Sequence, residues 1–269
     1  MESKELDLSF SAPLISSSSS RWWSGETVAV VTGANKGIGF ALVKRFAELG
    51  LTVVLTARDV ERGKKAADSL RQDHGLGNVN NAAVVFNEID ENSVEHAESV
   101  IKTNFHGAKL LTESLLPLFR FSTSISRILN ISSRLGSINK VRNLDVKATL
   151  QSERLSEQEI EEVVNKFVED VKKGTWQSQG WPEIWTDYSV SKLALNAYSR
   201  VLANKFEGSR LSINCFCPGF TQTSMTGGQG THSPDAAAQV AASLALLPPH
   251  NLPTGRFFLG FGSYNKSRL

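Results

Sequence analysis

The chain has 269 residues, 41% of them apolar and 21% charged, which suits one α/β domain with a sizeable core. The formal net charge of +2 is too small to indicate a nucleic acid or an anionic membrane as partner. No apolar run approaches the roughly 18 residues of a transmembrane helix. The two cysteines, Cys215 and Cys217, are too few for a closed zinc site or a disulfide framework. We therefore expect no metal and a reducing compartment.

Residues 1–24 are expected to form a disordered tail, because Ser16–Ser20 are five consecutive serines. Acidic residues near the start argue against a transit peptide, and the apolar pair Leu14–Ile15 is too short for the core of a signal peptide. The chain is therefore expected in the cytoplasm. Trp22 and Trp23, at the end of this tail, are candidates to dock on the domain that follows.

The first element of that domain is an apolar run, Val28–Val31, which predicts a strand, and a helical pattern continues from Phe40. Between them, Thr32–Gly39 reads Thr-Gly-Ala-Asn-Lys-Gly-Ile-Gly. A strand, a glycine turn and a helix in this order form a phosphate site, because the glycines let backbone N–H groups approach a pyrophosphate and the helix N-terminus adds partial positive charge. We therefore predict that this turn binds a dinucleotide.

Strands and helices alternate along the rest of the chain, which is the pattern of a parallel sheet covered on both faces. The further strands are expected at 51–56, 127–132, 211–217 and 256–262, and the further helices at 60–74, 93–116 and 233–247. We predict an α/β fold, a Rossmann-type doubly wound parallel sheet with helices on both faces, in a single domain over residues 25–269.

Residues 139–185 stand apart as an ordered helical insertion. Ser156 followed three residues later by Glu159 is a capping box, and Gly174 ends the helix. Five apolar residues then fall on one face of this helix: Ile160, Val163, Val164, Phe167 and Val171. The insertion is therefore expected to pack on an apolar surface.

Tyr188 and Lys192 are spaced i, i+4, which places a phenol and an ammonium on one helix face. A lysine beside a tyrosine favours the phenolate and is expected to lower the pKa of the phenol from about 10. Such a tyrosine can give a proton to a forming alkoxide, or accept one in reverse. Ser132 and Ser133, at the end of a predicted strand, belong to the same candidate site.

These motifs together resemble the short-chain dehydrogenase/reductase family, and within it the NADPH-dependent carbonyl reductase branch with the menthone/neomenthol and salutaridine reductases of plants. The resemblance extends over about residues 22–259. It rests on five motifs in order, which are Thr32–Gly39, Lys102-Thr-Asn-Phe-His-Gly107, Asn130-Ile-Ser-Ser133, Tyr188-Ser-Val-Ser-Lys192 and Cys217-Pro-Gly219.

The resemblance implies a role for each catalytic residue. Tyr188 is the acid/base, and Lys192 lowers its pKa while holding the nicotinamide ribose. Ser133 binds the substrate carbonyl oxygen, with Ser132 the weaker candidate, and Asn104 organises a water that relays protons to Lys192. The long spacing from Ser133 to Tyr188 is also typical of this branch, in which the inserted helix covers the face that most relatives use for tetramers, so a monomer is expected.

The cofactor is expected to be NADPH. An NAD site has an acidic residue at the end of the second strand, whereas this chain has Arg58 there and Lys36 in the glycine turn, two cations that suit a 2′-phosphate. Asp59 weakens this argument slightly because it can pair with Arg58. The residues expected to bind the cofactor are Gly33, Asn35, Lys36, Gly37, Ile38, Gly39, Arg58, Asn81, Tyr188, Lys192, Pro218, Gly219 and Thr223.

The family pattern breaks between about Ala57 and Ser93, where two further strands with a helix between them are normally found. Here a single apolar run, 82–86, remains, so the sheet is expected to be one or two strands short, as after an internal deletion. Two registers compete for this run. In the preferred one, residues 80–83 (Asn-Asn-Ala-Ala) replace the family's Asn-Asn-Ala-Gly; in the other, 83–86 is the adenine strand and Asp90 its acidic residue.

The preferred register predicts where the run lies. In the family's strand order 3-2-1-4-5-6-7, an empty strand 4 slot leaves backbone groups in the middle of the sheet unpaired, at about 1–3 kcal/mol for each buried group. We therefore expect residues 79–86 to fill that slot beside Val28–Val31.

Taken together, the resemblance implies an oxidoreductase that reduces a small apolar ketone or aldehyde to an alcohol with NADPH, with Tyr188 as proton donor. The alternative is a shortened, non-catalytic or poorly folding isoform, which keeps Tyr188 and Lys192 because the deletion lies elsewhere. Trp176, Trp181 and Trp185 either line an apolar substrate pocket or anchor the insertion on the domain.

Overall fold

The structure is a computed structural model, and it describes the chain except for residues 1–20, 72–81, 87–91, 120–124, 262–266 and 269. Its strands are β1 (Val28–Val31), β2 (Thr52–Leu55), β3 (Ser126–Ile131), β4 (Leu211–Cys217), β5 (Arg256–Leu259) and β6 (Ser267–Arg268). Within the described ranges, none of the helices is both long enough and apolar enough to span a membrane.

The helices alternate with the strands as expected. They are α1 (Gly37–Glu48), α2 (Val60–Arg71), α3 (Val94–Ile101), α4 (Gly107–Leu115), α5 (Leu144–Gln151), α6 (Glu157–Lys172), α7 (Thr186–Lys205) and α8 (Pro234–Ala245). A π-helical turn, η1 (Lys102–His106), joins α3 to α4. Short 3-10 turns are η2 (Leu116–Leu118), η3 (Arg134–Gly136), η4 (Ile138–Lys140), η5 (Ser224–Thr226) and η6 (Pro249–Asn251).

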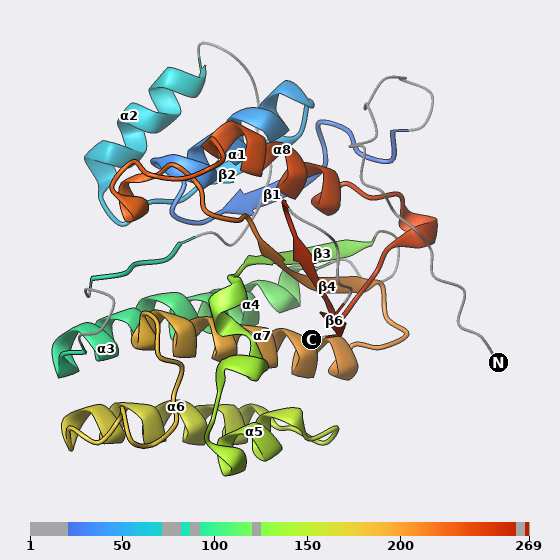
Figure 1. Ribbon diagram of the computed structural model, residues 1–269. Helices are drawn as coiled ribbons and strands as arrows, with labels where there is room; N and C mark the ends of the chain where they lie inside the picture. The colour runs from blue at the N-terminus through green and yellow to red at the C-terminus, as the bar shows by residue number, and fades with distance from the viewer. Residues whose placement is uncertain (1–20, 72–81, 87–91, 120–124, 262–266, 269) are drawn as a thin grey trace.

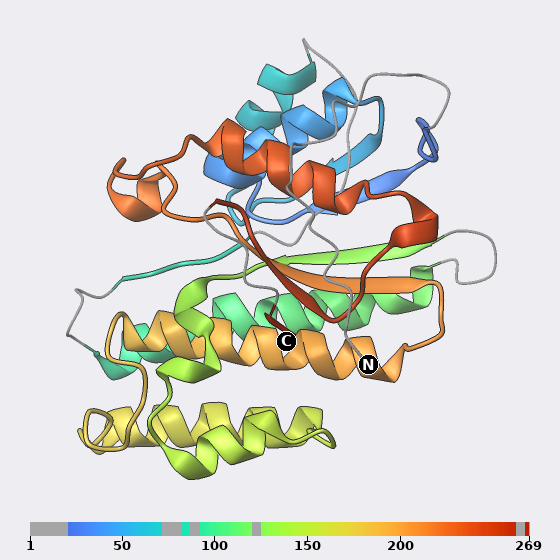
Figure 2. The same ribbon diagram turned by 45° about the vertical axis from the view of Figure 1, so that its right-hand side comes forward.

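The strands form two sheets in the part of the chain that is described. β1 pairs with β2 in parallel, and β3, β4 and β5 form a parallel sheet that β6 extends in antiparallel orientation. Helices α1 and α8 cover one side of these strands, and α4 and α7 cover the other (Figures 1 and 2). This confirms the predicted α/β fold.

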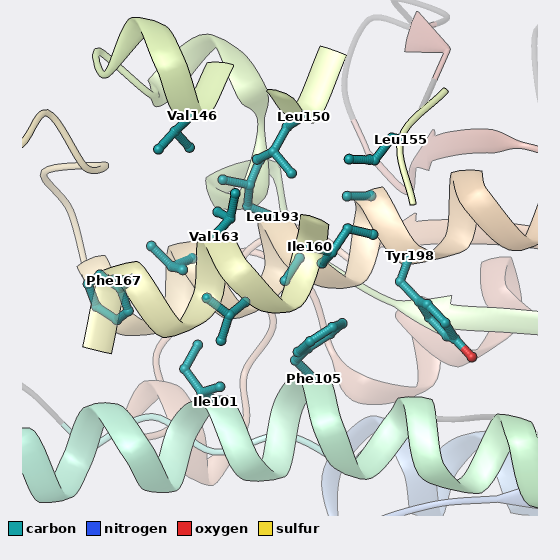
Figure 3. Packing of buried hydrophobic residues seen from close by; sticks show 14 of the residues in the cluster. Ile101, Phe105, Val146, Leu150, Leu155, Ile160, Val163, Phe167, Leu193 and Tyr198 are labelled. Atoms are coloured by element: carbon teal, nitrogen blue, oxygen red, sulfur yellow. The ribbon is translucent and has the colours of Figure 1, made fainter. Parts of the chain in front are cut away.

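Two buried apolar clusters hold the layers together. One lies between α7, the α3–α4 segment and the insertion, and Figure 3 shows Ile101 and Phe105 facing Ile160 and Val163 in it. The other joins α1, α8, β1 and β2 to Leu129 of β3 and to strand β4. The second cluster therefore links the two sheets through side chains.

The prediction for the strand 4 slot was wrong for the residues that can be checked. Residues 82–86 form no strand and have no ladder with β1, and residues 79–81 lie outside the described ranges. The run is not paired with β2 either, whose only described ladder is with β1. Val28 is 61% exposed among the described residues, so water can reach the start of β1.

The insertion was predicted correctly as an ordered helix. The capping box of Ser156 and Glu159 is present, and all five residues of the predicted apolar face are buried. Helices α5 and α6 form an outer layer against α7 and α3 (Figure 1). The insertion therefore covers the outward faces of these two helices.

The end of the tail lies on the domain. The indole N–H of Trp22 donates to the Leu246 carbonyl at 3.0 Å, and that of Trp23 donates to the Leu49 carbonyl at 3.1 Å. The guanidinium of Arg127, on β3, lies 3.5 Å from the centroid of the Trp22 ring. Trp22 therefore connects the chain before β1 to the other sheet, while residues 1–20 lie outside the described ranges.

Candidate active site

The glycine turn has the backbone that a phosphate cradle needs. Gly33 and Gly37 have φ angles of +59° and +57°, a conformation that a residue with a side chain rarely adopts. The N–H of Ala34 donates to the Thr56 carbonyl at 3.0 Å, which holds the turn against the end of β2. Lys36, the N-cap of α1, makes no side-chain cap bond, so the first N–H groups of α1 are left for a ligand.

Ala82 lies directly against this turn. Its N–H donates to the Thr32 hydroxyl at 2.8 Å, and a Cβ added to Gly33 would lie 2.8 Å from the Ala82 Cα. The run 82–86 therefore passes the carboxyl end of β1, as the preferred register requires for its Asn-Asn-Ala-Ala element. Asn81, a predicted cofactor ligand, lies outside the described residues.

The structure brings the predicted catalytic side chains of Tyr188, Lys192 and Ser133 together. Tyr188 and Lys192 lie on α7, and the Lys192 Nζ is 5.5 Å from the centroid of the Tyr188 ring. Nζ donates to the Ile131 carbonyl at 2.8 Å, which places it at the end of β3. The Ser133 hydroxyl, which follows β3, is hydrogen-bonded to the side chain of Tyr188. The carboxyl end of β3 thus meets the N-terminal half of α7.

The expected lowering of the Tyr188 pKa is contradicted. Burial raises the pKa of Tyr188, the neighbouring Cys217 thiol raises it further, and the hydrogen bond with Ser133 lowers it only in part. Burial also lowers the pKa of Lys192 to about 8. The cause is that both groups are withdrawn from water, which favours the neutral form of each, while the ammonium is directed to a carbonyl rather than to the phenol.

Asn104 connects the site to the run 82–86. It lies in the π-helical turn η1 and is 1% exposed. Its side chain accepts from the Val84 N–H at 2.8 Å and donates to the Val84 carbonyl at 3.0 Å. Its amide also donates to the Ser191 hydroxyl at 3.1 Å, and Ser191 donates to the Tyr188 carbonyl at 2.7 Å. Within the described ranges, no hydrogen bond joins the Asn104 side chain directly to Lys192.

Two positioning residues on α7 were not anticipated, Ser191 and Asn196. The side-chain oxygen of Asn196 accepts from the Ser132 hydroxyl at 2.6 Å, and its amide donates to the Gly136 carbonyl at 3.0 Å. Ser132 is therefore occupied in holding the loop after β3, while Ser133 faces Tyr188. The signal was present in the spacing, because Asn196 follows Lys192 by one helical turn on the same face.

The cations expected at the 2′-phosphate are exposed and unpaired. Arg58 and Lys36 are both exposed, and neither makes an ion pair in the part of the chain that is described. Asp59 accepts from the Arg62 N–H at 2.9 Å and lies 3.7 Å from the Arg62 guanidinium, so it caps α2 instead of neutralising Arg58. The residues present therefore fit a phosphorylated ribose.

The loop after β4 also reaches the glycine turn. A Cβ added to Gly37 would lie 3.5 Å from the methyl group of Thr223, so Thr223 and the turn are neighbours. Pro218 is buried and Gly219 has a φ of +76°. The predicted cofactor residues Gly33, Asn35, Gly37, Ile38, Gly39, Pro218, Gly219 and Thr223 thus gather at the carboxyl ends of β1 and β4, the edge where open parallel sheets bind ligands.

Two of the three tryptophans of the insertion pack in the apolar cluster beneath it. Trp181 is 2% exposed, and its indole N–H donates to a carboxylate oxygen of Asp170 at 2.9 Å. Trp176 packs against the same apolar cluster. Both therefore anchor the insertion. Trp185, partly buried at the start of α7, has a φ of 43° and is not in that cluster.

Comparisons with known proteins identify the family of this chain. A family described as short chain dehydrogenase matches residues 27–78 and 177–233. The chain is 33% identical to a (+)-neomenthol dehydrogenase of Arabidopsis thaliana, over 86% of this chain and 95% of that protein. It is 36% identical to carbonyl reductase [NADPH] 1 of Mus musculus, over 87% and 96%. The solved structure of salutaridine reductase from Papaver somniferum superposes with a TM-score of 0.79 at 32% identity, over 87% and 99%.

Proposed function

Because the chain belongs to the short-chain dehydrogenase/reductase family, we propose that it is an NADPH-dependent carbonyl reductase that converts a small apolar ketone or aldehyde to an alcohol. The observation that carries the proposal is the meeting of Tyr188, Ser133 and Lys192 at the carboxyl end of β3. The relatives named neomenthol dehydrogenase and carbonyl reductase [NADPH] support the substrate class and the cofactor.

The protein residues have separate roles in this reaction. NADPH, when bound, supplies the hydride that reaches the carbonyl carbon. The Ser133 hydroxyl binds the carbonyl oxygen and directs it toward Tyr188. The phenol gives its proton to this oxygen, and its raised pKa supports this role because the phenol remains protonated at neutral pH. Lys192 holds the ribose, and Asn104 organises a proton relay behind it.

The cofactor choice rests on charge. Arg58 and Lys36 are exposed and make no ion pair within the described ranges. Arg58 follows β2 and Lys36 lies in the glycine turn, where a 2′-phosphate would be bound. Tyr188 and Lys192 would bind the nicotinamide ribose, with Pro218, Gly219 and Thr223 at the carboxamide.

Assembly and location complete the proposal. We propose a monomer, because α6 already lies on the outward faces of α3 and α7. Light scattering tests this, and a tetramer would contradict it. We also propose a cytoplasmic location, which cell fractionation tests; the two free cysteines, both buried, agree with a reducing compartment.

Purified protein tests the reaction. NADPH should quench tryptophan fluorescence, and menthone or a similar ketone should cause its oxidation. Tyr188→Phe should lower the rate by at least about 100-fold while NADPH still binds. The matched control is Tyr198→Phe on the same helix, because the Tyr198 hydroxyl has no hydrogen-bond partner among the residues that the structure describes. A folded protein that neither binds nor oxidises NADPH would support the non-catalytic alternative.

A further inference from the structure

His232 and Phe261 form a stacked aromatic pair beside the turn that follows β4. Their ring centroids are 3.6 Å apart and their planes differ by 16°. His232 comes at the end of the loop that begins at Phe220, and Phe261 follows β5. Neither residue belongs to the motifs that indicated the site.

Both rings pack against the backbone of Gly219. A Cβ added to this glycine would lie 3.2 Å from the His232 Cδ2 and 3.5 Å from the Phe261 Cδ2. Gly219 has a φ of +76°, so the turn depends on a residue without a side chain in both conformation and space. The stacked rings therefore lie against the turn at Gly219.

Phe261 is fixed by its neighbour Gly260. The N–H of Gly260 donates to the Cys217 carbonyl at 2.8 Å, at the last residue of β4. A Cβ on Gly260 would lie 2.9 Å from two ring atoms of Phe216 and 3.1 Å from the Cys217 carbonyl oxygen. The chain thus approaches β4 closely enough to set Phe261 over the next two residues, Pro218 and Gly219.

His232 is fixed by the base of its loop. The N–H of Gln222 donates to the His232 carbonyl at 2.8 Å, and the N–H of Thr231 donates to the Phe220 carbonyl at 2.8 Å. These bonds close the loop 220–232 at its two ends. The same loop carries Thr223, whose methyl group faces Gly37 of the glycine turn. The His232 ring therefore lies where the loop, the turn and the segment after β5 meet.

We propose that His232 and Phe261 are positioning residues that fix the Pro218–Gly219 turn for the nicotinamide end of the cofactor. They act through Gly219 and touch no reacting atom. This inference rests on the proposed NADPH-dependent reaction. It adds that the stacking of His232 on Phe261 contributes to the affinity for the nicotinamide half of NADPH.

The test compares two ligands that share the adenosine half. NADPH contains the nicotinamide, whereas adenosine 2′,5′-bisphosphate lacks it. In His232→Ala the Kd for NADPH should rise on the order of fivefold, as expected for the loss of one aromatic pair. The Kd for adenosine 2′,5′-bisphosphate should stay within about twofold, because the glycine turn and Arg58 are unchanged. His232→Phe keeps a stacking ring and should restore NADPH binding.

The exposed His250, on η6, provides the matched control, and His250→Ala should change neither Kd. The proposal is overturned if His232→Ala binds NADPH as tightly as the wild type, or if it loses affinity for both ligands equally, since that pattern indicates general destabilisation. Failure of the wild type to bind NADPH at all would instead overturn the proposed function. The two failures are therefore distinguishable.

Discussion

The side chain of Asn104 forms hydrogen bonds with both the N–H and the C=O of Val84, at 2.8 Å and 3.0 Å. A neighbouring strand would normally satisfy such backbone groups. Here one buried amide, held in a π-helical turn, does so for a run that forms no strand. Asn104 thus combines a structural role with its expected place in the proton relay.

Replacing Asn104 should reduce the stability of the fold. Asn104→Ala leaves the Val84 N–H and C=O without their partner, and we expect the free energy of unfolding to fall by about 2 kcal/mol. Urea denaturation measures this. The exposed Asn165 on α6 is the control, and Asn165→Ala should stay within about 0.5 kcal/mol of the wild type. Equal losses in the two variants would show that the bonds to Val84 contribute nothing.

Lys192 should make stability depend on pH. Its pKa is about 8 in the folded protein against 10.5 for an unperturbed lysine, so between these values the unfolded state binds more protons than the folded state. The contribution of Lys192 to the free energy of unfolding should therefore rise with pH from 8 to 10.5, because the cost of burying the ammonium disappears as Lys192 loses its proton. Below pH 8 both states are protonated, and Lys192 should cause no slope.

Urea denaturation of Lys192→Met across this pH range isolates the effect. Compared with the wild type, the variant should lose the rising contribution of Lys192 between pH 8 and 10.5. Lys173, exposed at the end of α6, is the control, and Lys173→Met should keep the rise. A wild-type profile parallel to that of Lys192→Met would contradict a depressed Lys192 pKa.

Arg58 should select NADPH over NADH. Removing this cation from the proposed 2′-phosphate site should raise the Kd for NADPH by about tenfold or more and leave the Kd for NADH nearly unchanged. Arg58→Ser and Arg62→Ser form a matched pair, because Arg62 is also exposed but is engaged by Asp59. If both substitutions weaken NADPH binding alike, the effect comes from general charge and not from a specific contact.

Gly136→Ala should disturb the site from a distance. A Cβ there would lie 2.5 Å from the Lys192 carbonyl carbon and 2.7 Å from the Leu193 nitrogen, both backbone atoms. The loop after β3 must then move away from α7, so Ser133 loses its position beside Tyr188. We expect a loss of about 1–3 kcal/mol in stability and a larger fall in kcat than in NADPH affinity. Gly25→Ala, with its nearest neighbour 3.9 Å away, is the control, and steady-state kinetics decide the outcome.

Patterns that depend on neighbours along the chain were readable from the sequence. The capping box of Ser156 and Glu159, the apolar face of α6 and the i, i+4 pair of Tyr188 and Lys192 all form as expected. Each depends on residues within one or two helical turns, so local geometry alone produces it. The glycine turn belongs to the same class, since its positive φ angles follow from the residue type.

The pKa of Tyr188 and the pairing of residues 82–86 depend on segments that are distant in the sequence, so only the tertiary structure revealed them. Burial of Tyr188 reversed the expected pKa shift, because desolvation depends on everything packed around the phenol and not on Lys192 alone. The position of residues 82–86 likewise depends on long-range contacts. Asn104 forms hydrogen bonds with the backbone of Val84, and the second apolar cluster joins the two sheets. Strand pairing and burial both depend on contacts between residues that are far apart in the sequence. The sequence therefore determined which side chains form this site. Packing determined their pKa values and the contacts that hold them in place.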